Sequence, residues 1–268
     1  MKSIIISLLL FYKNIAMFFF LLSVLLLTGC SAYQYISSPQ YIPLNKKKGE
    51  LKLAISSNSY QIGYAFSDKF SVFHTGYDRA FIERSPFLGS LGKENMGNVN
   101  DKDGQSEFNL GASYFKKSEK FHYEVLAGVG YGKLHYQSEN GFGYYSFDLK
   151  ATKYNFFIQP DLCILLNENI ELGAFAKLIF LDYFYHSNSG NGLYLSSWDK
   201  SFYGGKSSVF YFIEPGFIAR FGSENVKFQT QVSPAFNITN FGDKSIDYRK
   251  FNLRFSLFLS LDLFKGDN

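Results

Sequence analysis

The feature that most constrains this chain is an alternation of apolar and polar residues with a period of two, which runs from Gly49 nearly to the C-terminus. Successive side chains of a β-strand point to opposite faces, so this period predicts strands rather than helices. Segments 170–180 and 208–221 show it, and so does the last segment, where Phe258 is the one apolar residue on the polar face. The apolar face of that last segment is Phe251, Leu253, Phe255, Leu257, Leu259, Leu261 and Leu263.

The polar face of these segments indicates where the apolar face lies. A soluble sheet usually exposes a face dense in Lys, Glu and Thr. Here the polar positions carry Gly, Ser, Asn, Gln and isolated charges, as in Gly128, Gly130 and Gly132. Small residues suit the crowded interior of a narrow barrel, and large apolar residues suit lipid. The predicted strands are about 9–14 residues long, enough to cross a bilayer. We therefore predict an all-β fold, a closed antiparallel up-and-down transmembrane β-barrel.

Ten strands are predicted, and eight or twelve remain open. Tight turns alternate with longer polar loops at 81–105, 137–146, 184–206 and 237–247. In bacterial barrels the strand number is even, short turns are periplasmic and long loops are extracellular. This places the start of the first strand on the periplasmic side, beside the N-terminal anchor described next. The ten strands are expected at 49–57, 59–66, 69–80, 106–116, 120–136, 147–165, 169–183, 207–221, 225–236 and 248–264.

The N-terminus has the pattern of a secretory leader. Residues 1–29 carry two basic residues and an apolar run at 17–27, which is short for a transmembrane helix. Leu27-Thr28-Gly29-Cys30 resembles the bacterial lipobox, which implies cleavage before Cys30 and its modification with acyl chains such as palmitate. A single membrane span and an ordinary signal peptide are the alternatives. Residues 30–48 then form a lipidated tether, and 49–268 the barrel.

The tether is expected to be a linker. Its segment 31–48 is short and polar, with Pro39 and Pro43, and ends in three lysines at 46–48. Such composition is typical of a connection between two anchored parts of a chain. The lysines either contact anionic lipid headgroups or are simply solvated.

The C-terminal strand ends in Leu263-Phe264, which resembles the assembly signal of outer-membrane barrels. With Pro43-Leu44 and the basic entry at 48–52, the chain resembles the small β-barrel lipoproteins of the Bacteroidota outer membrane, a family of largely unassigned function. It departs from the usual barrel in its polar tail, 265–268. The resemblance implies an outer-membrane location with an anchor at Cys30. It also implies that the barrel-assembly and lipoprotein-sorting machinery and the bilayer itself are partners.

Charges expected to face the lumen are the internal candidates for function. Charges of both signs in a narrow interior must pair or meet water, because an isolated buried ion costs several kcal/mol. They are interpreted as a network that fills and rigidifies the barrel, with a selectivity region of a thin channel as the alternative. The set is Glu124, Glu171, Lys177, Glu214, Arg220, Arg254 and Asp262.

The third long loop offers a second candidate. It mixes Gly, Ser and Asn with aromatic residues, a blend found in recognition surfaces, although an aromatic belt at the membrane interface has the same content. The candidate binding residues are Tyr185, Tyr194, Trp198 and Tyr203.

Composition excludes several classes of protein. With 19% aromatic and 19% charged residues the chain is neither disordered nor a coiled coil. A net charge of +4, which falls when Lys2 and Lys13 leave with the leader, does not indicate nucleic-acid binding. Two cysteines and four scattered histidines predict no metal site. Cys163 is expected to be a buried apolar filler.

The first functional hypothesis is a non-enzymatic outer-membrane barrel lipoprotein without a cofactor. Its filled lumen would support extracellular loops for surface interaction or envelope integrity. A narrow pore or conduit for small solutes is the alternative. A third hypothesis is a membrane-embedded hydrolase that uses His186 with Asp182 and Asp199.

Overall fold

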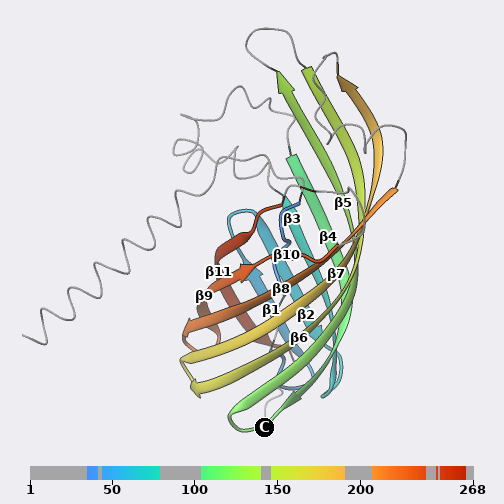
Figure 1. Ribbon diagram of the computed structural model, residues 1–268. Coiled ribbons are helices and arrows are strands. Elements are labelled where there is room, and N and C mark those ends of the chain that lie inside the picture. The colour runs from blue at the N-terminus through green and yellow to red at the C-terminus, as the bar shows by residue number, and fades with distance from the viewer. Residues whose placement is uncertain are drawn as a thin grey trace, which may run out of the picture. The chain divides into compact units, whose positions relative to one another are not determined.

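The computed structural model is an all-β protein whose strands close into a barrel (Figure 1). No helix long and apolar enough to cross a membrane occurs in the part of the chain that is described. The predicted fold class, a closed antiparallel barrel, is confirmed. The described residues are 35–41, 44–78, 104–139, 146–190, 207–239, 246 and 248–263.

The described residues form eleven strands, ten of which make the closed ring. Each of the ten predicted segments coincides with one strand of that ring, and β10 is a short addition outside it. The strands are β1 Glu50–Ile55, β2 Ser59–Ala65, β3 Phe70–Asp78, β4 Gly104–Lys117, β5 Phe121–Glu139, β6 Ser146–Asn167, β7 Ile170–Gly190, β8 Ser207–Gly222, β9 Val226–Pro234, β10 Phe236–Asn237 and β11 Phe251–Asp262.

The ring is built almost entirely from neighbours in sequence. Strands β1 to β8 each pair antiparallel with the next one, β9 pairs with β11, and β11 closes the ring by pairing with β1 from Glu50↔Asp262 to Ile55↔Leu257. The short β10 pairs with β8 beyond the end of β9. Closure leaves no unpaired sheet edge along the ring, so the backbone amides of the wall bond to one another.

The two ends of the barrel differ. At what we call the short-turn end, tight turns join β2 to β3, β4 to β5, β6 to β7 and β8 to β9. Ser118 N–H, for example, donates to the carbonyl of Phe121 at 2.7 Å. At the opposite, long-loop end lie the hairpin at 56–58 and the ends of the strands that flank 79–103, 140–145 and 191–206. Strand β7 continues to Gly190, so Tyr185 and His186 belong to a strand and not to the predicted loop 184–206.

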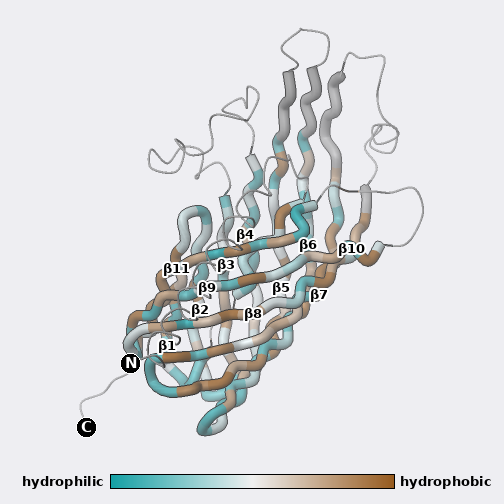
Figure 2. The backbone as a smooth tube through the Cα atoms, turned by 60° about the vertical axis from the view of Figure 1, so that its left-hand side comes forward, coloured by the Kyte–Doolittle hydropathy of each residue, from teal (hydrophilic) through white to brown (hydrophobic). Residues whose placement is uncertain are grey.

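Burial alternates along the strands as the sequence predicts. Large apolar side chains on the outer face are exposed, with Phe217 at 67% and Val129 at 59%. Their neighbours on the inner face are buried, including Glu214 at 0% and Arg220 at 1%. Apolar and polar residues alternate along the tube in Figure 2. The wall therefore has an apolar exposed outside, whereas its inside combines many buried polar and charged side chains with a cluster of buried apolar ones.

Candidate functional site: the occupied lumen

The lumen contains the chain's own N-terminal segment. We call residues 35–41 and 44–46 the luminal segment; its polar members Ser37 and Gln40 are both 0% exposed. The sequence predicted a linker over 31–48, and in its described part this is wrong up to Asn45, which is also buried. The reason is physical: the side chains of Ser37, Ser38 and Gln40, which make the segment look solvated, find their hydrogen-bond partners inside the barrel.

The luminal segment runs from one end of the barrel to the other. At the long-loop end, Tyr35 forms an isolated parallel bridge with Tyr248, and its carbonyl accepts from Arg249 N–H at 3.0 Å. At the short-turn end, Lys46 Nζ lies 4.0 Å from the carboxylate of Glu171, a residue at the start of β7. The chain then turns into β1 through Gly49, whose φ of 85° lies in the left-handed region that favours glycine.

The part of the luminal segment nearest the long-loop end, which we call its upper part, is bound by Glu214 of β8. The part nearest the short-turn end is its lower part. The Glu214 carboxylate accepts three hydrogen bonds of 2.6 Å each, from the hydroxyls of Tyr35 and Ser37 and from the amide of Gln40. The Tyr35 ring also stacks on Phe212, with centroids 4.1 Å apart.

Two cations of the wall complete this upper site. Lys177 Nζ donates to Ser38 Oγ at 2.8 Å and lies 4.2 Å from the centre of the Phe157 ring. Arg254 donates to the carbonyl of Ser37. Lys177 also stands opposite Glu214 in the β7–β8 register, where their charges attract. The segment is thus held by side chains from β7, β8 and β11.

The middle of the luminal segment bonds to glutamines from three sides of the barrel. Gln61 and Gln231 each donate to the carbonyl of Gln40 at 3.2 Å, and Gln159 donates to the carbonyl of Tyr41 at 2.7 Å. These bonds satisfy backbone groups that would otherwise be buried without partners. The Tyr41 ring stacks on Phe73 at 5.0 Å.

One inner-wall glycine makes room for Tyr41. A Cβ atom built on Gly63 would lie 1.4 Å from the Tyr41 hydroxyl oxygen. No side chain of any size can occupy position 63 while Tyr41 is in place. The inside of the wall and the luminal segment are therefore complementary in shape.

The lower part of the luminal segment ends in an apolar contact. Leu44 packs with Cys163, Phe175 and Ile218 in a small buried cluster. Its φ of 52° is in the left-handed region, which costs a non-glycine residue roughly 1–2 kcal/mol. Its N–H donates to the carboxylate of Glu124 at 3.1 Å, which together with the packing holds this conformation.

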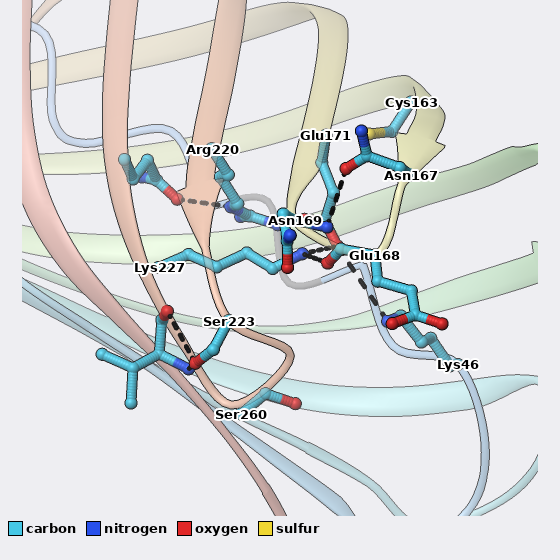
Figure 3. Close-up of polar contacts among 12 residues, drawn as sticks. Lys46, Cys163, Asn167, Glu168, Asn169, Glu171, Arg220, Ser223, Lys227 and Ser260 are labelled. Carbon is cyan, nitrogen blue, oxygen red and sulfur yellow. Dashed lines mark hydrogen bonds and ion pairs between the residues drawn. The ribbon is translucent and has the colours of Figure 1, made fainter.

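A second charge cluster, at the short-turn end, links neighbouring strands of the wall to one another (Figure 3). Glu171 of β7 accepts from Lys227 Nζ of β9 at 2.7 Å and pairs with Arg220 of β8 at 3.4 Å. Arg220 also donates from Nε to Gln229 at 2.8 Å and lies 3.8 Å from the centre of the Phe258 ring. Three consecutive strands of the ring are linked by these contacts.

The structure places all seven predicted luminal charges toward the interior or its ends. Five are buried, and they divide between the two clusters and the Leu44 contact. Arg254 reaches the luminal segment, and Asp262, at the short-turn end, pairs with Lys47 of the exposed entry to β1. That pairing raises the pKa of Lys47 above its ordinary value.

Sequence reasoning missed several buried charges. Each lies between residues that the alternation assigns to the outer face, as Lys227 does between Val226 and Phe228, so the signal was present. Lys153 forms an ion pair with Glu107, and Lys52 lies 3.4 Å from Glu50. The missed residues are Glu50, Lys52, Glu107, Lys153, Asp161 and Lys227.

The other predicted sites are not reached by the described residues. Cys30, Tyr194, Trp198, Asp199 and Tyr203 lie outside them. No group of three or more His, Cys, Asp or Glu among the described residues is arranged to hold a metal ion.

Little space remains within the described lumen around Pro39. A cavity of about 10 Å³ lies between Pro39, Gln61, Gln231 and Arg254, which is about the size of one water molecule. A larger pocket of about 610 Å³ lies at the long-loop end, lined by strands β1 to β5 and the hairpin at 56–58. The lumen is occupied, and the long-loop end is concave.

No protein-family model matches the sequence, and no curated protein matches it either. What the fold and site define is a class: a closed ten-stranded antiparallel β-barrel whose interior is filled by its own N-terminal segment and by paired charges.

Proposed function

We propose that this protein is an outer-membrane β-barrel lipoprotein, anchored through Cys30, whose filled lumen supports extracellular loops for surface interaction or envelope integrity. The observation that carries the proposal is the wall itself, which exposes large apolar side chains on its outside and buries many charged and polar side chains on its inside. In water, so large an exposed apolar surface is a liability. In a bilayer the same surface is favourable, and closure of the ring satisfies the backbone without water.

The height of the apolar surface supports this assignment. On β8, Tyr211 and Phe221 are both exposed, at 41% and 46%, and mark its two ends. They are separated by about 10 residues, which at about 3.3 Å per residue and a tilt of about 40° corresponds to about 25 Å. This is the height of the apolar band in outer-membrane barrels.

A chain of aromatic rings follows the outer wall near the long-loop end. Tyr60, His74, Phe108, Tyr131 and Tyr154 come from five consecutive strands, β2 to β6, with neighbouring ring centroids 5.4 to 6.0 Å apart. Aromatic girdles of this kind sit at the membrane interface, where an apolar ring with a polar edge is favoured. The rings support a membrane boundary at this level.

The bilayer assignment is tested by lysine substitution on the outer face. We expect Phe217→Lys to lower the free energy of unfolding in lipid vesicles by about 2–4 kcal/mol, because the charge would lie in hydrocarbon. Glu224→Lys is the matched control, since Glu224 is also exposed but belongs to a short turn. Equal effects of the two substitutions, with the wild type remaining soluble without detergent, would contradict the proposal.

The filled lumen is tested by conductance. The purified full chain in a planar bilayer is expected to give no stable channel openings, because the luminal segment and its partners occupy the interior. Steady openings of the wild type would favour the alternative, a narrow pore for small solutes, and would require the luminal segment to leave the barrel.

A further inference from the structure

The direction of the luminal segment determines which leaflet can receive the lipid. We propose that the chain passes through its own barrel, so that the acyl chains of Cys30 enter the leaflet on the long-loop side, the outer leaflet of the outer membrane. This inference rests on the proposed function for the membrane and for the modification of Cys30. Its new content is the side of the membrane, which the sequence placed at the other end, beside the start of the first strand.

The first observation is where the described chain begins. Tyr35 lies beside Tyr248 and Arg249, which immediately precede the start of β11 at the long-loop end. From there the segment runs past Glu214 and Gln159 to Glu171 at the short-turn end. The start of β1 and the start of the luminal segment are therefore at opposite ends of the barrel.

The second observation is the length of chain between Cys30 and Tyr35. Five residues span at most about 18 Å, even when fully extended. Strand β11, which runs from the level of Tyr35 to the short-turn end, has 12 residues, which at about 3.3 Å each and a tilt of about 40° covers about 28 Å of height. A cysteine within 18 Å of Tyr35 cannot reach the leaflet at the short-turn end.

The third observation excludes a return through the lumen. The residues from Tyr35 to Tyr41 are all buried, and wall side chains surround them. The cavity beside Pro39 holds about one water molecule. A second pass of the chain would need the space that the first pass occupies.

The wall is formed by shorter strands on the side where Tyr35 lies, which we call the low side: β9 has 9 residues and β11 has 12, against 19 to 22 in β5 to β7. Strands β9 and β11 end together at the Pro234↔Phe251 pair, whereas β5 to β7 continue upward for several residues beyond β4, as Figure 1 shows. Tyr35 bridges to the residue just before β11, on this low side. If Cys30 is acylated a few residues before Tyr35, only the ends of these short strands separate it from the leaflet on the same side.

The experiment measures accessibility on intact cells that express the full chain. Cys163→Ala first removes the other thiol, which is buried. Ala32→Cys then reports on the segment next to the anchor, Ser57→Cys on the long-loop end and Glu119→Cys on the short-turn end. A membrane-impermeant maleimide is applied, and each labelling rate is divided by the rate measured for the folded protein in detergent.

We expect Ala32→Cys to label on intact cells within a few-fold of Ser57→Cys, and Glu119→Cys to label at least about tenfold more slowly until the cells are permeabilised. If Ser57→Cys labels but Ala32→Cys behaves like Glu119→Cys, the passage through the barrel is wrong while the proposed function stands. If Ser57→Cys and Glu119→Cys do not differ, the transmembrane placement itself is wrong, and the inference falls with it.

Discussion

Two inward-facing glutamates on neighbouring strands, Glu171 and Glu214, are equivalent in sequence pattern but not in role. Glu171 is neutralised by the wall, through Arg220 and Lys227, and touches the luminal segment only through Lys46 at 4.0 Å. Glu214 instead accepts three hydrogen bonds from the luminal segment. One carboxylate joins strands to each other, and the other binds the N-terminal segment to the wall.

The difference shows that two buried acids, each with cations nearby, can take their hydrogen bonds from different parts of the chain. A carboxylate that accepts several hydrogen bonds is stabilised in its charged form, as an ion pair would stabilise it. At the short-turn end those donors are fixed lysine and arginine side chains. At the long-loop end they arrive with the luminal segment, so that Glu214 depends on the segment as much as the segment depends on Glu214.

The largest expected effect is on the wall cluster. Glu171→Ala leaves Arg220 and Lys227 buried without their carboxylate, which should lower the free energy of unfolding of the barrel by about 3–5 kcal/mol. Denaturant unfolding in detergent micelles or vesicles measures this. Glu168→Ala is the control, because its side chain is exposed and only its backbone carbonyl contacts Lys227. A loss of less than 1 kcal/mol for Glu171→Ala would mean that the cluster does not join the strands.

An intermediate effect, of a different kind, is expected at Glu214. Glu214→Ala removes the common acceptor of Tyr35, Ser37 and Gln40, each bond to a charged group contributing about 1.5–3 kcal/mol. We expect amide hydrogen exchange in 35–41 to accelerate at least about tenfold while exchange in β2 to β6 changes little. Glu214→Gln keeps part of the acceptor and should fall between. Uniform acceleration over the whole barrel would remove the distinction between the two glutamates.

The smallest effect separates two tyrosines of the luminal segment. Tyr35→Phe loses a hydrogen bond to a charged group and should accelerate exchange in 35–41 by about tenfold. Tyr41→Phe should be neutral or slightly protective, because among the described residues no partner is found for its buried hydroxyl. Both rings stay in place, so the comparison isolates the hydroxyls. Equal effects would show that stacking, and not Glu214, holds the segment.

Most of the wall could be predicted from the sequence. A period of two persists through the strands of the ring because each residue faces either the exposed outside of the wall or its enclosed inside, with little tertiary context to override it. Strands β5 to β7 were predicted too short at the long-loop end, since beyond the apolar band both faces are polar and the alternation fades. The two-residue β10 is set by pairing with β8 and carries no periodicity of its own.

The interior could be predicted only in part. The alternation identified Glu171, Glu214 and Arg220 as inward-facing, and applying it to every predicted strand would have added Glu107, Lys153 and Lys227. It could not distinguish the two glutamates, because their partners lie far away in the chain. The burial of Ser37 and Gln40 was out of reach for the same reason. A polar segment without periodicity is indistinguishable from a linker until the wall that surrounds it is known.

The complementarity between Gly63 and Tyr41 has a consequence for the sequence of events in folding. A fit this close is not expected to form by threading the N-terminal segment into a barrel that is already closed. We therefore expect the first and last strands, β1 and β11, to pair late in folding, after the other strands of the ring have surrounded the N-terminal residues. The pairing of β1 with β11 then encloses the N-terminal residues in the lumen.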